Sequence, residues 1–151
     1  MTTKQEVFIS VDVETAGPIP GEYSMLTLGA CCVDDPSRTF SCSIKPISDK
    51  FVPEALEVTG LSLQTLAKDG LPPDVAMLNF AAWVGSQCTQ WELPVFVGLN
   101  APFDWSFVNY YFHRFTGSNP FGFTAVDIKG CTWAPRAARG RTRDPAPWLA
   151  G

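Results

Sequence analysis

The chain has 151 residues, of which 46% are hydrophobic and 17% are charged, a composition typical of one globular domain with a full apolar core. Its formal net charge is −4, which argues against binding nucleic acid through net positive charge but not against an enzyme with an acidic, cation-recruiting pocket. No apolar run reaches the roughly 18 residues of a membrane helix, and the polar start MTTKQEV lacks the apolar stretch of a signal peptide. We therefore expect a cytoplasmic protein that does not bind membranes.

The first third of the chain predicts three strands. Residues 7–13 (VFISVDV) are β-branched and aromatic, and residues 25–33 (MLTLGACCV) form a second apolar run. Residues 39–46 (TFSCSIKP) alternate, with Phe40 and Cys42 on one face of a half-buried strand. Because turn residues make the links short, we expect an antiparallel three-strand meander.

The rest of the chain alternates helical and strand patterns. In chain order we expect short helices around a Thr-Gly break in residues 53–70, a helix in 72–88, a buried strand in 93–100, a helix in 104–115, and a short strand leading into a helix in 124–130. Within residues 72–88, helical spacing is followed by Val75, Leu78, Ala82 and Val84 or Gly85. The order predicts an α/β domain with a mixed sheet flanked by helices.

The cysteines follow no metal-binding or disulfide pattern. Their number is odd, and no two are spaced as CxxC: they are Cys31, Cys32, Cys42, Cys88 and Cys131. We expect buried free thiols, as in a reducing compartment.

Two acids interrupt the first apolar strand. Asp12 and Glu14 are two residues apart, so on a strand they project from the same face while Val13 faces the other way. Two carboxylates this close repel each other unless a cation lies between them, and oxygen ligands favour Mg²⁺ or Mn²⁺. A solvent-facing pair beside a turn is the plainer alternative.

A second polar pair follows the buried strand at 93–100. Asn100 ends that strand and Asp104 begins the next helix, the region of an α/β sheet where ligands collect. Taken alone, Asp104 is also a good helix-capping residue. The combination with Asp12 and Glu14 favours a site of three carboxylates.

These segments resemble a known family. FISVDVETAG (8–17) resembles the first motif of the DEDD superfamily of 3′–5′ exonucleases, and VGLNAPFDWSFV (97–108) resembles the second, N-x-x-F-D. Residues 54–84 resemble the segment between these motifs in the proofreading-exonuclease and ribonuclease-T-like branch. The resemblance spans roughly residues 7–133 and implies a ribonuclease H-like fold.

The resemblance also implies a site and a reaction. Asp12, Glu14 and Asp104 would be catalytic and would hold two Mg²⁺ or Mn²⁺ ions, which clamp the attacking and leaving oxygens of a phosphodiester. The expected substrate is the 3′ end of single-stranded DNA or RNA, and a homodimer is expected as well. The substrate-binding residues implied are Thr15, Leu26, Leu61, Asn100 and Phe103.

The chain departs from the family pattern near its end. The family requires a final His-x₄-Asp or Tyr-x₃-Asp, and neither occurs; the single histidine, His113, falls inside the second-motif helix, where we expect a surface or half-buried residue. We interpret Asp127 as a helix cap or structural acceptor. General-base loss commonly costs roughly 10²–10⁴ in rate, so we expect impaired activity.

The composition changes sharply near residue 134. We expect residues 1–133 to form the exonuclease domain, incomplete at its C-terminus, and the Arg, Pro and Ala-rich residues 134–151 to form a poorly folded tail. A frameshift in a GC-rich gene would explain this composition, and a natural end in a degenerate family member is the alternative.

Two other functions remain open from the sequence. A catalytically inactive module of the same fold, binding nucleic acid or protein, would explain the missing final motif. An unrelated metal-dependent phosphatase would explain the acids but not residues 54–84.

Overall fold

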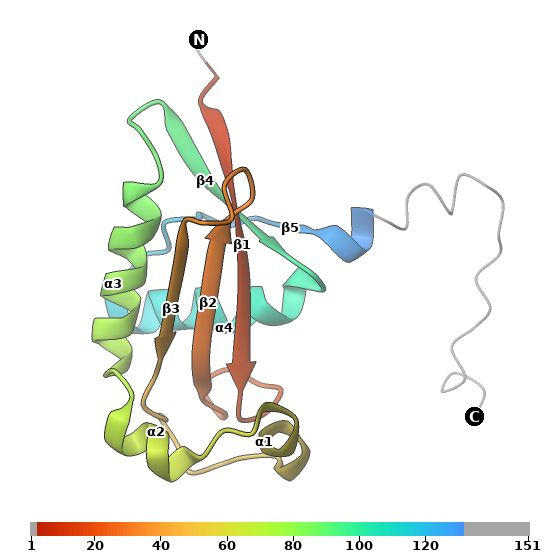
Figure 1. Ribbon diagram of the computed structural model, residues 1–151, viewed down its shortest axis with the longest axis vertical. Helices are drawn as coiled ribbons and strands as arrows, with labels where there is room; N and C mark the ends of the chain where they lie inside the picture. The colour runs from red at the N-terminus through yellow and green to blue at the C-terminus, as the bar shows by residue number, and fades with distance from the viewer. Residues whose placement is uncertain (1–2, 132–151) are drawn as a thin grey trace, which may run out of the picture.

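Five strands form one mixed sheet in the computed structural model, which describes residues 3–131 (Figure 1). The strands are β1 (Gln5–Thr15), β2 (Met25–Cys32), β3 (Thr39–Ser43), β4 (Glu92–Gly98) and β5 (Ala125–Asp127), in the spatial order β3-β2-β1-β4-β5. β1, β2 and β3 form an antiparallel meander, and β4 and β5 run parallel to β1 and to each other. The predicted mixed sheet is confirmed.

Within residues 3–131, helices α1 (Pro53–Thr59), α2 (Leu63–Asp69), α3 (Pro73–Ser86) and α4 (Ala101–Thr116) lie between the strands. Residues 128–131, directly after β5, are also helical. The Thr-Gly break separates α1 from α2, because Gly60 ends α1 with a left-handed φ of 68° that favours glycine. Figure 1 shows α3 running beside β3, α4 crossing one face of the sheet, and α1 and α2 near the end of β1.

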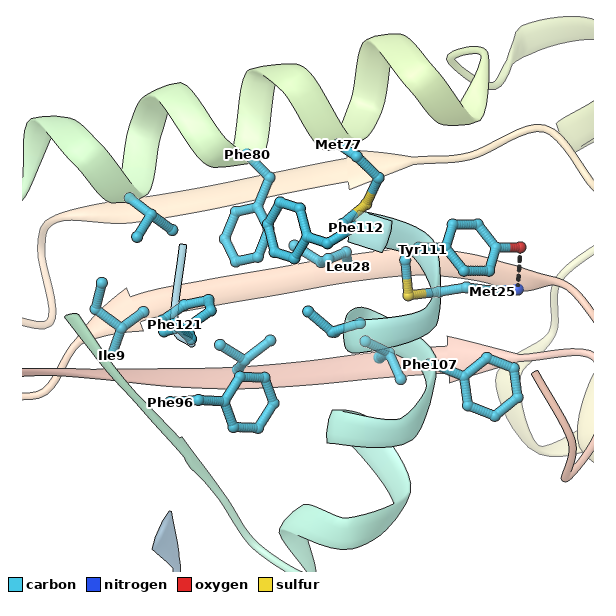
Figure 2. Close-up of a cluster of buried hydrophobic side chains, with 14 of the residues drawn as sticks. Ile9, Met25, Leu28, Met77, Phe80, Phe96, Phe107, Tyr111, Phe112 and Phe121 are labelled. Atoms are coloured by element: carbon cyan, nitrogen blue, oxygen red, sulfur yellow. Dashed lines mark hydrogen bonds between the residues drawn. The ribbon is translucent and has the colours of Figure 1, made fainter. Parts of the chain in front are cut away.

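The core lies between the sheet and helices α3 and α4. Along β1 the odd-numbered Ile9, Val11 and Val13 are buried, whereas Asp12 and Glu14 between them are exposed. Figure 2 shows aromatic rings filling the layer above these strands, and Phe80 of α3 stacks on Phe112 of α4 with 5.6 Å between ring centroids. The helices therefore cover one face of the sheet and leave the two acids on the other.

One buried hydrogen bond joins α4 to the meander. The backbone N–H of Met25 donates to the hydroxyl of Tyr111 at 2.8 Å, and both residues are fully buried (Figure 2). Burial raises the pKa of Tyr111 to about 12, so the hydroxyl stays protonated at neutral pH. The bond helps to fix the rotation of α4 against the sheet.

The apolar spacing that predicted a helix here does not mark its buried face. The helix is confirmed as α3, but Val75 and Leu78 are 38% and 57% exposed, and the buried residues are Ala76, Met77, Phe80 and Val84. Apolar residues occur on every side of this helix, so its sequence does not determine which side faces the sheet. The cysteines are free as expected, but Cys32 alone among them is buried.

The C-terminal tail at 134–151 lies outside the described residues. Within residues 3–131, none of the helices combines the length and the apolar character that crossing a membrane would require.

Candidate active site

The acids of β1 stand on the face of the sheet that α3 and α4 leave open. In the register of β1 against β2, Asp12 lies opposite Gly29 and Glu14 opposite Thr27, so these four residues share a face. A hollow of about 540 Å³ lies over this part of the sheet. Its lining residues are Asp12, Glu14, Thr27, Leu28, Gly29, Ser41, Cys42 and Ser43.

The β2 and β3 residues of the hollow were not singled out from the sequence. The alternation in residues 39–46 already separates Ser41 and Ser43 from the apolar face of Phe40 and Cys42. What it does not give is the register that places these serines beside Thr27 and Gly29. The sequence could not indicate these residues because it does not give the register between β2 and β3.

Asp104 reaches β1 from the start of α4. β1 pairs with β4 only as far as Ser10, because β4 ends at Gly98 and the chain then turns into α4. Beyond this pairing the backbone N–H of Val13 donates to Asp104 Oδ1 at 3.0 Å. Asp104 is 6% exposed and lies in the first turn of the helix, so it is not the residue that caps α4.

Asp127 performs the capping instead. Its Oδ1 accepts from the backbone N–H of Ala101, the first residue of α4, at 3.1 Å, and from that of Lys129 at 3.2 Å. Desolvation would raise the pKa of Asp127, but backbone hydrogen bonds, the one from Ala101 first among them, outweigh it and lower the pKa. The interpretation of Asp127 as a structural acceptor is confirmed, and it fixes the end of α4 that carries Asp104.

The three carboxylates interact electrostatically. Desolvation and then the charge of Asp12 raise the pKa of Glu14. Desolvation is also the main reason why the pKa of Asp104 is raised; the Val13 hydrogen bond opposes it, and the charges of Asp12 and Glu14 add to it. Arg38 and Lys50 form ion pairs with acids outside the site, namely Asp34, Asp35 and Glu22. The site concentrates negative charge.

Comparison with known proteins shows a relative that is similar to this chain in sequence. No protein-family model matches the chain. The 3′–5′ DNA exonuclease Cap18 of Escherichia coli is 60% identical to it over 129 residues, which are 85% of this chain and 69% of that protein.

The chain belongs to the 3′–5′ exonuclease family of Cap18.

Solved structures of exonuclease I share the fold of this 3′–5′ exonuclease family chain. A product-bound exonuclease I has a TM-score of 0.69 at 18% identity over 95% of this chain, and E. coli exonuclease I in complex with a dT13 oligonucleotide has a TM-score of 0.70 at 19% identity over 95%. This chain spans 35% and 32% of those two longer chains. The predicted exonuclease family and ribonuclease H-like fold are confirmed.

The carboxylates of the candidate site fit a divalent cation in their chemistry but not in their placement. Asp12, Glu14 and Asp104 offer carboxylate oxygens alone, the donors that Mg²⁺ and Mn²⁺ prefer. As placed, however, no three His, Cys, Asp or Glu side chains in the described part of the chain form a group that could hold a metal ion. The three carboxylates therefore match a hard divalent cation in donor type, while their placement does not form a complete metal-binding group.

The predicted substrate residues of the exonuclease lie in different surroundings. Asn100 is exposed with φ 64° and ψ 46° just before α4, and Phe103 in the first turn of α4 is half-buried with its ring 5.3 Å from that of Phe107. Leu61 is half-buried between α1 and α2, beside a small apolar cluster.

Thr15 and Leu26 are engaged inside the protein. Thr15 is 7% exposed, and its hydroxyl donates to the carbonyl of Gly17 at 2.9 Å. Leu26 is 0% exposed and packs with Ala16 and Leu66, so in this conformation its side chain offers no surface to a base. The expected contacts of both residues with substrate remain predictions.

Asp104→Asn should distinguish the effect of the Asp104 charge from the effect of its hydrogen bond. The amide oxygen of asparagine still accepts from Val13, while the desolvated charge facing Asp12 and Glu14 is gone. We therefore expect a higher melting temperature than wild type at neutral pH in EDTA, together with exonuclease activity lowered by more than about 100-fold, since even outer-shell changes at metal sites cost roughly 10- to 100-fold.

The pH dependence checks the cause. The pKa of Asp104 in the folded protein is raised above its ordinary value of 3.8. Between neutral pH and 3.8 the folded state therefore binds more protons than the unfolded state. Wild type should accordingly gain stability relative to Asp104→Asn as the pH falls from neutral toward 3.8. Asp104→Ala is the matched control: it leaves the Val13 N–H without a partner, so we expect a loss of about 1–3 kcal/mol. Equal melting temperatures for all three proteins would contradict the assignment.

Proposed function

We propose that this chain hydrolyses phosphodiester bonds of single-stranded DNA, starting from the 3′ end and using divalent cations. The main structural support is the bond from Val13 to Asp104, which holds a third carboxylate next to the strand that carries Asp12 and Glu14. We propose DNA rather than RNA as the substrate because Cap18 is a DNA exonuclease and a structure of exonuclease I contains a dT13 oligonucleotide. An RNA substrate and a homodimer have no such support.

Each acid has a task in the proposed reaction. Asp12 and Glu14 project into the open hollow and would hold cations at the reacting phosphate, and Asp104 would add an oxygen from its anchored position on α4. Two bound Mg²⁺ or Mn²⁺ ions would neutralise charge on the phosphate and make a water molecule nucleophilic. Without cations the three acids would repel a phosphodiester, so activity should require them.

The open hollow suits an extended strand. The sheet face over β1, β2 and β3 is reached directly from solvent, and Ser41 and Ser43 at its edge are exposed. His113, the single histidine, is exposed on α4 and lines a different hollow from Asp12 and Glu14. We therefore do not assign it as the base of the reaction.

The proposal is tested with a 5′-labelled single-stranded DNA and Mn²⁺. We expect a ladder of products that shorten from the 3′ end and that EDTA abolishes. Binding without shortening would favour the alternative of an inactive nucleic-acid-binding module. Hydrolysis of small phosphate esters without any shortening of DNA would favour a phosphatase and would overturn the proposal.

A further inference from the structure

Neither packing nor backbone conformation explains why residue 29, inside strand β2, is glycine. Two glycines lie inside strands of the described chain, Gly29 in β2 and Gly98 in β4. A Cβ added at Gly98 would lie 3.1 Å from the Cα of Ala101, a tight contact that gives glycine a packing reason at this position. A Cβ at Gly29 would meet nothing closer than the carbonyl oxygen of Asp12 at 4.0 Å, and its backbone has no positive φ. Since glycine weakens a strand interior, its presence needs another explanation.

The position of Gly29 supplies that explanation. It lies directly opposite Asp12 on the open face, and side chains at opposed positions have Cβ atoms roughly 4.5–5.5 Å apart. Any larger residue at 29 would therefore stand in the hollow beside the Asp12 carboxylate. With glycine, the floor of the hollow is bare backbone next to the acids.

Three hydroxyls surround this bare floor. Thr27 pairs with Ser43 and Gly29 pairs with Ser41, so all three hydroxyl side chains share the face of Asp12. None of them forms a side-chain hydrogen bond with another described residue. By contrast, the Ser24 hydroxyl accepts from the backbone N–H of Ile47 at 2.9 Å. The three hydroxyls of the hollow are free to donate to phosphate oxygens and to accept from sugar hydroxyls.

We propose that Gly29 is a clearance residue that lets the sugar–phosphate of a single-stranded nucleic acid lie on the sheet beside Asp12, where Thr27, Ser41 and Ser43 bind its oxygens. A hollow of about 540 Å³ is of the size that holds small ligands, which is roughly 300–1,000 Å³. The inference rests on the proposed function for the identity of the ligand, but it can be tested by binding alone.

Gly29→Leu is the decisive variant. We expect it to bind a 5′-fluorescein-labelled oligothymidylate about tenfold or more weakly than wild type, measured by fluorescence anisotropy with Ca²⁺, because the side chain fills space the strand needs. Its melting temperature should equal or exceed that of wild type, because leucine replaces a strand-weakening glycine in open space. A purely structural role for Gly29 would instead lower the melting temperature.

Thr39→Leu is the matched control. Thr39 lies on the same face of the sheet, opposite Cys31, but outside the hollow. We expect it to bind the oligothymidylate like wild type, which shows that an added leucine on this face is not harmful in itself. Ser41→Ala combined with Ser43→Ala should weaken binding by about three- to tenfold, the worth of one or two hydrogen bonds.

The outcomes separate this inference from the proposed function. If wild type binds but does not shorten DNA, and Gly29→Leu does not bind, the exonuclease proposal fails and the clearance role stands. If wild type shortens DNA and Gly29→Leu binds and shortens it equally well, the clearance role is overturned while the exonuclease proposal survives. Absence of oligothymidylate binding by wild type would overturn the clearance role.

Discussion

Asp12→Asn should abolish 3′-end shortening of single-stranded DNA, with a rate at least about 100-fold below wild type. Asp12 is one of two exposed acids of β1 that line the hollow, and its charge contributes to the raised pKa of both Glu14 and Asp104. Asparagine keeps the shape of the side chain but removes the negative charge that would attract a cation. The measurement is the initial rate of product formation from a 5′-labelled strand in Mn²⁺.

A stability measurement provides a second test of Asp12. A cation that binds the folded state alone raises its melting temperature, so Mn²⁺ should stabilise wild type and stabilise Asp12→Asn less. In EDTA the two proteins should melt alike or the variant slightly higher, because an exposed substitution rarely changes stability by more than about 0.5 kcal/mol. Asp49→Asn, at an exposed acid outside the hollow, should match wild type in both assays. Full activity or undiminished Mn²⁺ stabilisation in Asp12→Asn would contradict the assigned site.

Phe80→Ala should lower the free energy of unfolding by about 3–5 kcal/mol, a large part of the roughly 5–15 kcal/mol that stabilises a typical domain. Phe80 is fully buried, and its ring lies 5.0 Å from that of Phe40, 5.6 Å from Phe112 and 6.1 Å from Phe121. Removing it leaves a cavity where α3, α4 and β3 meet (Figure 2). Urea unfolding followed by circular dichroism measures the loss.

Phe123→Ala is the control for this prediction. Phe123 is 90% exposed, so we expect its removal to change the free energy of unfolding by no more than about 0.5 kcal/mol. If Phe80→Ala costs no more than Phe123→Ala, the packing between α3 and the sheet is not as described.

Local patterns in the sequence were enough to predict the meander and the acids of β1. Alternating and continuous apolar runs marked the strands, and the two-residue spacing of Asp12 and Glu14 placed both on one face without any knowledge of partners. Identification of the two motifs was sufficient for the family, which the 60% identity with Cap18 confirms.

Side-chain roles that depend on distant partners were harder to predict. Asp104 taken alone also fitted a helix cap, but its carboxylate accepts a hydrogen bond from Val13, 91 residues away, and Asp127, which follows α4 in the sequence, bonds to the first residue of that helix. Leu26, for which a contact with the terminal base remains a prediction, is fully buried against Ala16 and Leu66. In each case the deciding contact comes from a segment far along the chain.

Local spacing was enough to place Asp12 and Glu14 on one face of a strand, and the resemblance of two motifs was enough to predict the 3′–5′ exonuclease family. The buried side of α3 depends on packing, since that helix is apolar all round, and the strand residues opposite Asp12 depend on register, which is a long-range property. The hollow with Gly29 as its floor is a product of that register.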